Sequence, residues 1–140
     1  MSIKEIQDEI IEEFAMFDDW MQKYDYLIEL SKDIPPISED YRLNENLIKG
    51  CQSKVWLHAS HVDGKVRYTA DSDAIITKGI AALLIRVLSE QKAEDILDNE
   101  MYFIDAIGLK QHLSMTRSNG LVSMIKQMRF YALAFQAKQV

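Results

Sequence analysis

The pair Asp63-Gly64, set between two alternating segments, constrains the fold of this chain more than any other feature of its sequence. Residues 55–62 and 65–70 alternate apolar and polar side chains, as half-buried strands do. An Asp-Gly pair between them predicts a hairpin with a two-residue turn, in which Val62 lies opposite Lys65. Six apolar side chains then share one face: Val55, Leu57, Ala59, Val66, Tyr68 and Ala70. Two strands alone are marginally stable, so we expect a third strand or a layer of helices to support them.

Helical periodicity precedes the predicted hairpin. Ser2 and Glu5 have the spacing of a capping box, and apolar residues follow at steps of three and four. A second amphipathic helix is predicted to begin near Asp19 and to end before Pro35-Pro36, because proline cannot continue a helix. Periodicity is lost over residues 37–52, which predicts an extended loop or one short helical turn before the hairpin.

Further helices are predicted after the hairpin. Apolar residues between 76 and 87 indicate a deeply buried helix, in which Gly79 allows a neighbour to approach closely. Shorter helices are expected around residues 94–97 and before Gly108, which suits a left-handed stop. Candidate caps for the buried helix are Asp71, Ser72 and Asp73. Candidate starts of the last helix are Ser114 and Ser118. The apolar face of the hairpin is expected to meet these helices.

Composition indicates one compact, helix-rich domain spanning residues 1–140. Hydrophobic residues make up 48% of the chain, which has only five Gly and two Pro. A net charge of −6 has the wrong sign for holding a phosphate backbone, so we expect no nucleic-acid partner. No apolar run approaches the roughly 20 residues that cross a bilayer, and the N-terminus lacks an apolar signal core. A single cysteine cannot form an internal disulfide, so we expect a reducing compartment, the cytoplasm.

That single cysteine, Cys51, lies off every periodic apolar stripe. It sits between Gly50 and Gln52, just before the predicted hairpin. Free cysteines are most often small buried hydrophobes. The adjacent glycine gives the backbone freedom, however, and Lys49 and Lys54 would favour the thiolate if they point inward. Position alone therefore leaves both an inert thiol and a reactive thiol open.

Other chemistries have weaker support. A cysteine hydrolase needs an imidazole beside Cys51, and the candidates are His58, His61 and His112. A zinc site would lack a cysteine pair, and His58 and His61 point to opposite faces of a regular strand. No glycine cluster follows a strand and opens a helix, so a dinucleotide or phosphate loop is absent. We expect no metal site.

The residues around the cysteine carry a family resemblance. Residues 46–56, Asn-Leu-Ile-Lys-Gly-Cys-Gln-Ser-Lys-Val-Trp, closely resemble the signature of the SufE family, the sulfur-acceptor proteins that work with cysteine desulfurases in iron–sulfur cluster assembly. Motifs elsewhere in the chain are similar to the family's at matching separations, so the resemblance covers nearly the whole sequence. They are Trp20 with Lys23-Tyr24 and Ile28-Glu29-Leu30, Arg42, Asp71-Ser72-Asp73-Ala74 with Lys78-Gly79, and Gln111-His112-Leu113 with Arg117-Ser118 and Gly120-Leu121.

The resemblance implies a fold and a function. The fold is α+β of the SufE/IscU type, a single domain with helices packed on a small antiparallel sheet built around the hairpin. The function is to accept sulfane sulfur from the persulfide of a SufS-type, PLP-dependent cysteine desulfurase, to stimulate that enzyme, and to deliver the sulfur to an iron–sulfur cluster scaffold complex. The chain is then a carrier rather than an enzyme and binds no cofactor itself, because PLP belongs to the desulfurase. A homodimer is compatible with this role.

The resemblance also implies roles for individual residues. Cys51 is the expected persulfide carrier, on a loop that shelters the sulfur at rest and extends toward the partner on docking. Gly50 is the expected hinge, and Gln52 and Ser53 are expected to support the loop. Three residues are expected to fix the loop or contact the desulfurase, unless they only cap helices and pair with each other: Arg117, Asp73 and His112. The rival hypotheses are a small cysteine hydrolase using Cys51 with a histidine, and a structural adaptor with an inert cysteine.

Overall fold

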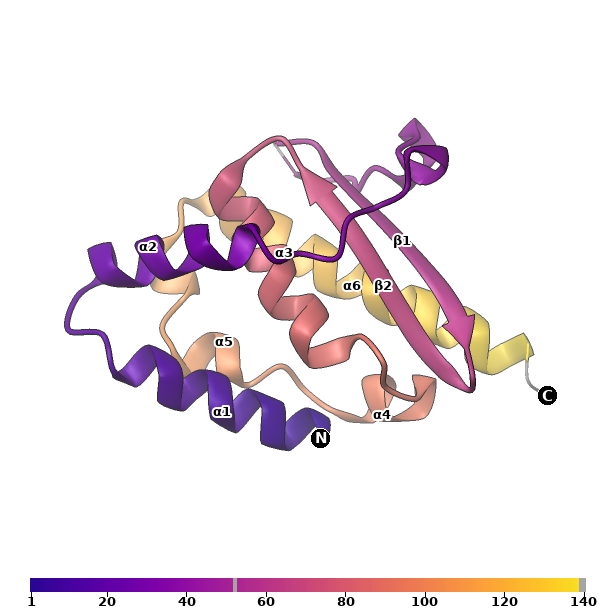
Figure 1. The fold of residues 1–140 in the computed structure, drawn as a ribbon, viewed down its shortest axis with the longest axis horizontal. Helices are drawn as coiled ribbons and strands as arrows, with labels where there is room; N and C mark the ends of the chain where they lie inside the picture. The colour runs from indigo at the N-terminus through magenta and orange to yellow at the C-terminus, as the bar shows by residue number, and fades with distance from the viewer. Residues whose placement is uncertain (52, 139–140) are drawn as a thin grey trace.

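The protein folds as a set of helices packed against one β-hairpin (Figure 1). The computed structural model describes residues 1–51 and 53–138. The elements in chain order are α1 (Ile3–Ala15), α2 (Trp20–Ser31), the 3-10 turns η1 (Glu39–Tyr41) and η2 (Asn44–Asn46), β1 (Val55–Val62), β2 (Lys65–Ser72), α3 (Ile75–Leu88), α4 (Ala93–Asp98), α5 (Phe103–Ala106), the 3-10 turn η3 (Lys110–His112) and α6 (Met115–Lys138). Among these described helices, none combines the length and the apolar character that a membrane span requires.

β1 and β2 form the predicted hairpin. Their antiparallel register places Val62 opposite Lys65 and Leu57 opposite Ala70. Asp63 and Gly64 both have positive φ angles, 52° and 79°, as a two-residue hairpin turn of type I′ requires. All six apolar side chains predicted to share a face are buried, and the most exposed of them retains 8% of its surface. The register and the buried face are therefore confirmed.

Helices provide the support that the two described strands need. α3 lies at the centre of the fold, where it contacts α1, α2, β2 and α6, and nine of its 14 residues are buried. α6 passes behind the hairpin in Figure 1 and contacts β1, α3 and α4. Four buried side chains of α6 complete the core: Leu121, Met124, Met128 and Ala132. The prediction that the helix after the hairpin is deeply buried is confirmed.

Short backbone contacts occupy parts of both edges of this sheet. On the β2 edge, the Ala70 amide donates to the Pro35 carbonyl (3.3 Å) and the Val66 amide donates to the Gln91 carbonyl (2.8 Å). On the β1 edge, the amide of Ile48 donates to the carbonyl of Val55 at the start of the strand (2.8 Å). These bonds satisfy backbone groups that an open edge would expose. The contact at β1 also joins the segment before Cys51 to the strand after it.

Most of the predicted helix ends are confirmed. Ser2 and Glu5 form a reciprocal capping box at the start of α1. The Asp19 carboxylate accepts a backbone hydrogen bond at the start of α2 (2.9 Å). Gly108 follows α5 with a φ of 73°, which gives the left-handed stop. Of the two predicted starts of the last helix, Ser114 is correct, because its hydroxyl accepts a backbone N–H from the first turn of α6 (3.3 Å).

The segments that flank the hairpin differ from the prediction. Two 3-10 turns, η1 and η2, lie where an extended loop or one short helical turn was expected before the hairpin. The predicted caps of α3 are wrong, because its N-cap is Ala74 and no side chain makes a cap hydrogen bond there. Asp71 and Ser72 instead extend β2, while the Asp73 carboxylate accepts a hydrogen bond from the Lys54 amide (3.0 Å). Tertiary hydrogen bonding thus replaced the local cap.

Replacing Gly79 with alanine is expected to destabilise the protein. Alanine ordinarily stabilises a helix relative to glycine by about 0.5–1 kcal/mol, but a Cβ at position 79 would lie 2.3 Å from the Leu27 carbonyl oxygen of α2. Relief of this overlap requires α2 and α3 to separate. We therefore expect a loss of about 1–3 kcal/mol in the free energy of unfolding, measured by urea denaturation.

The matched control is Ile75→Ala, at an exposed position of the same helix, for which we expect a change within about 0.5 kcal/mol. A Gly79→Ala protein as stable as wild type would contradict the close packing of α2 on α3.

Candidate functional site

Cys51 lies in a loop whose two ends are joined by backbone hydrogen bonds. Residues 47–48 run antiparallel to the start of β1, because Leu47 bridges to Trp56 and the Ile48 amide donates to the Val55 carbonyl (2.8 Å). The loop of residues 49–54 therefore leaves the sheet and re-enters it at one place. The two ends of the loop are therefore fixed to the folded core.

The Cys51 thiol is half-buried against α6. Its Sγ lies 3.7 Å from the Gly120 carbonyl oxygen, so the thiol donates a hydrogen bond to the helix backbone. Burial raises the pKa of the Cys51 thiol, because removal from water disfavours the thiolate. Lys49 and Lys54 are both exposed, so the condition under which they would favour the thiolate is not met. In this arrangement the thiol is protonated at neutral pH.

Gly50 meets two constraints that glycine alone satisfies without strain. Its φ of +90° lies in a region that residues with a side chain rarely adopt. A Cβ at this position would also lie 2.8 Å from the Ser123 hydroxyl oxygen of α6. Gly50 thus lets the chain pass close over α6 just before Cys51. Of the two residues predicted to support the loop, Ser53 is half-buried, and Gln52 lies outside the described residues.

Asp73 fixes the far end of this loop. Its Oδ1 accepts a hydrogen bond from the Lys54 amide (3.0 Å), and its own amide donates to the Lys54 carbonyl (3.2 Å). The Ser72 hydroxyl donates to the same carbonyl (2.9 Å). Three hydrogen bonds therefore hold Lys54 at the end of β2, and Asp73 takes part in two of them.

Arg117 and His112 lie at the start of α6 and just before it. Arg117 is exposed and precedes Gly120 by about one helical turn. The His112 imidazole stacks on the Trp20 ring, with centroids 4.1 Å apart, and the His112 carbonyl accepts a hydrogen bond from the Tyr24 hydroxyl. The structure thus places Arg117 one turn away from the residue that touches the thiol, whereas His112 is held against α2.

The structure contains a charged cluster near the loop that the periodicity of the sequence could not reveal. The Arg42 guanidinium lies over the Trp56 ring, 4.6 Å from its centroid, and pairs with the Asp71 carboxylate. The Lys78 ammonium approaches the same carboxylate at 3.2 Å. Arg42 and Asp71 are partly buried, so this pair is screened less than an exposed one. It joins the segment before the loop to both strands and to α3.

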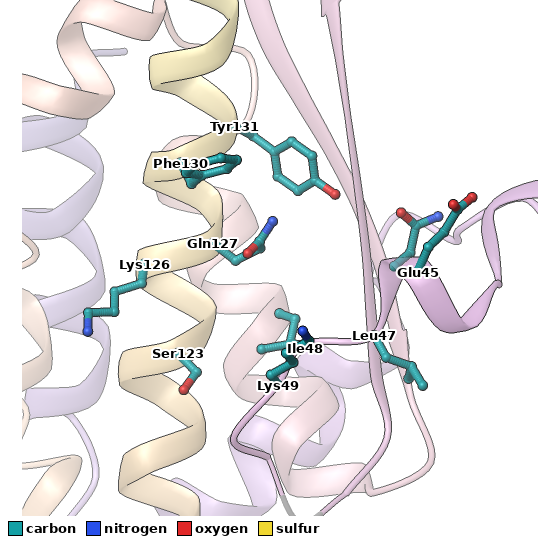
Figure 2. A pocket seen from close by; sticks show the side chains of 10 residues that line it. Glu45, Leu47, Ile48, Lys49, Ser123, Lys126, Gln127, Phe130 and Tyr131 are labelled. Carbon is teal, nitrogen blue, oxygen red and sulfur yellow. The ribbon is translucent and has the colours of Figure 1, made fainter.

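A groove of about 430 Å³ opens between the loop segment and α6 (Figure 2). The segment from Glu45 to Lys49 forms one wall, and α6 from Ser123 to Tyr131 forms the other. In Figure 2, Gln127 and Tyr131 extend from α6 toward the opposite wall. The first residue of the loop, Lys49, therefore borders the groove.

The histidines occupy positions unlike those of a cysteine hydrolase. Each imidazole stacks on an aromatic ring, His58 on Tyr41, His61 on Phe135 and His112 on Trp20, while the thiol donates to a carbonyl. A hydrolase needs a thiol–imidazole pair instead. Within residues 1–51 and 53–138, no group of three or more His, Cys, Asp or Glu side chains is arranged to hold a metal. Fold and site together define a small α+β protein that holds one sheltered thiol in a closed loop.

Comparison with known proteins identifies the family. Residues 8–132 match the SufE family, described as an Fe-S metabolism associated domain. An uncharacterized SufE-like protein of Rhizobium etli is 40% identical over 128 residues, which cover 87% of this chain and 86% of that protein. Another, from Synechocystis, is 37% identical over 130 residues, covering 93% of this chain and 82% of that protein. The chain belongs to the SufE family, and its role lies in Fe–S metabolism.

A plant relative and a solved structure are also similar to this chain. SufE-like protein 1, chloroplastic/mitochondrial, of Arabidopsis thaliana is 37% identical over 131 residues, which cover 93% of this chain but 35% of the plant protein. The solution structure of a hypothetical protein from Thermus thermophilus matches with a TM-score of 0.77 at 22% identity, covering 92% of this chain and 94% of that one. The structural match confirms the α+β fold, with helices packed on a small antiparallel hairpin.

Replacing Asp73 with alanine is expected to loosen the cysteine loop. The variant loses the acceptor for the Lys54 amide, which costs about 0.5–1.5 kcal/mol of unfolding free energy for a hydrogen bond of this kind. A looser loop exposes Cys51 more often, so alkylation of the native protein by iodoacetamide should be faster than in wild type.

Asp73→Asn is the matched control, because it keeps the Oδ1 acceptor and should react at nearly the wild-type rate. If Asp73→Ala also reacts at that rate, Asp73 does not restrain the loop.

Proposed function

We propose that this protein is a sulfur acceptor that takes persulfide sulfur onto Cys51 from a SufS-type, PLP-dependent cysteine desulfurase. It stimulates the desulfurase by removing the product persulfide and delivers the sulfur to an iron–sulfur cluster scaffold complex. One observation carries the proposal: the single cysteine of a SufE-family chain is half-buried in a loop that is closed by hydrogen bonds and begins at the edge of a groove. An inert core cysteine needs neither the glycine of positive φ before it nor a loop of this kind.

The transfer is a thiol–disulfide type of exchange. The Cys51 thiolate attacks the outer sulfur of the donor persulfide, a new S–S bond forms on Cys51, and the donor S–S bond breaks. The electron pair of that bond leaves with the donor cysteine as a thiolate. The sulfane sulfur keeps its oxidation state, so the step needs no oxidant. Delivery to the scaffold repeats the same exchange with Cys51 as the leaving group.

The resting arrangement suits a carrier that must not react prematurely. A protonated thiol is a poor nucleophile, and burial lowers the thiolate fraction of Cys51 further by raising its pKa. Movement of the loop out of its contact with α6 would return the thiol to water and lower its pKa toward the ordinary range. Docking on the desulfurase therefore couples access to activation, because both follow from the same movement.

Other features of the proposal follow from the sequence. Residues 1–140 act as one domain, and the chain binds no cofactor, since PLP belongs to the desulfurase. Gly50 acts as the hinge, with Gln52 and Ser53 supporting the loop. The cytoplasm is the proposed compartment, because a reducing environment keeps a single cysteine available as a thiol.

The central prediction is that sulfur transfer increases the intact mass of the protein. After anaerobic incubation with the cognate desulfurase and free cysteine, wild-type protein should gain one sulfur atom, about 32 Da, in an intact-mass measurement. Cys51→Ser should gain nothing, and neither should wild type when free cysteine is left out. Wild-type protein that stays unmodified while the desulfurase turns over would rule out the carrier role.

Arg117 is the best-placed partner contact among the predicted residues, because it is exposed and one helical turn from Gly120. Removing a charge at the rim of an interface mainly slows association. We expect Arg117→Ala to reduce stimulation of the desulfurase on the order of threefold to tenfold at low salt, with an unchanged melting temperature.

The control is Lys138→Ala, which removes a cation at the other end of α6 and should leave stimulation unchanged. Equal stimulation by both variants and wild type would exclude Arg117 from the interface.

A further inference from the structure

Gly120 is an unusual residue for its position. It lies in the interior of α6 and is buried, yet glycine is the poorest helix former after proline. Its backbone gives no reason for glycine, because Gly120 is not among the residues with positive φ, which include Gly50, Gly64 and Gly108. The reason must therefore lie in what surrounds the missing side chain.

The space beside Gly120 is occupied by Cys51. A Cβ built on Gly120 would lie 3.1 Å from Cys51 Sγ, 3.8 Å from its Cβ and 3.9 Å from its Cα, and these are the three nearest heavy atoms. The shortest of these separations is tighter than ordinary van der Waals contact. The Gly120 carbonyl also accepts the thiol hydrogen bond at 3.7 Å. One residue thus supplies both the room for the sulfur and the acceptor for its proton.

The next turn of the same helix supports the arrangement. Ser123 follows Gly120 by three residues, so both lie on one face of α6. A Cβ on Gly50 would come within 2.8 Å of the Ser123 hydroxyl, which shows how closely the loop lies on this turn. Gly120 and Ser123 therefore contact two consecutive residues of the loop, Gly50 and Cys51.

We propose that Gly120 is a positioning residue that holds the Cys51 thiol in its resting place and thereby sets its reactivity. With hydrogen in place of a side chain, the sulfur reaches the helix backbone, stays partly out of water and donates its proton to the Gly120 carbonyl. A side chain at position 120 displaces the sulfur outward and breaks that hydrogen bond. The inference concerns the thiol itself and does not depend on whether Cys51 carries sulfur.

The test measures alkylation of the native protein by iodoacetamide as a function of pH. Gly120→Ala should lower the apparent pKa of Cys51 toward the ordinary thiol range and raise the rate at pH 7.5 by about threefold to tenfold, because a shift of one pH unit changes the thiolate fraction about tenfold. Gly120→Val should give a larger effect in the same direction.

Two controls separate positioning from a general change in the helix. Asn119→Ala makes a comparable gain in helix propensity at the exposed neighbouring position and should leave the pH profile unchanged. In urea-unfolded protein all variants should react at one rate, because the difference belongs to the fold. A wild-type pH profile in Gly120→Ala, or the same shift in Asn119→Ala, overturns the proposal.

A double-mutant cycle that compares melting temperatures tests the proposal even if Gly120→Val folds poorly. Gly120→Ala should raise the melting temperature more in a Cys51→Ala background than in wild type, because removal of Sγ removes the crowded contact. Equal shifts in both backgrounds would show that the two positions do not interact. The result of this cycle does not depend on the sulfur-transfer assay, because that assay uses the wild-type chain with its desulfurase.

Discussion

The packing of Tyr68 between the hairpin and α6 is the interaction on which the site depends. Its side chain is fully buried, its hydroxyl donates to the Met128 carbonyl of α6 (2.6 Å), and its amide donates to the Ser89 hydroxyl after α3 (3.0 Å). A buried phenol with its hydroxyl satisfied in this way fixes the strand against the helix. The Cys51 loop extends from this hairpin, and Gly120 belongs to this helix. The Tyr68 contact therefore helps to set the distance between the thiol and its acceptor.

Sequence patterns predicted the parts of the fold that depend on local geometry. Alternation around Asp63-Gly64 determined the register of the hairpin and its buried face, because the side-chain period of a strand is two. The capping box at Ser2 and the left-handed stop at Gly108 are likewise set by neighbouring residues. The cap of α3 was mispredicted because Asp73 bonds to Lys54, which lies 19 positions earlier and on the other side of the hairpin. Residue spacing alone carries no signal for such a contact.

The candidate site also combines features that the sequence revealed with contacts that only the structure shows. The resemblance around Cys51 identified the thiol, and the structure added where the thiol rests. Its hydrogen bond to Gly120 spans 69 positions, so no periodic pattern could reveal it. The local signals were the match of Gly120-Leu121 to a family motif and the presence of a glycine inside a helix, which costs stability and calls for a reason. Lys49 and Lys54 are also close to Cys51 in the sequence, but both are exposed, so the condition set for their electrostatic role is not met.

A resting thiol that is protonated and half-buried is compatible with reaction because little of the protein has to move. The Ile48–Val55 hydrogen bond and the Lys54–Asp73 clamp hold the two ends of the loop, and Lys49 borders the groove (Figure 2). In the proposed function, extension of the tip breaks the thiol hydrogen bond, a net cost of at most about 0.5–1.5 kcal/mol because a thiol is a weak donor, and exposes one small side chain. A docking partner can supply free energy of this size from a few contacts, whereas it could not unfold the hairpin. In the proposed function, the fixed ends and this small cost allow the same cysteine to be unreactive alone and reactive in a complex.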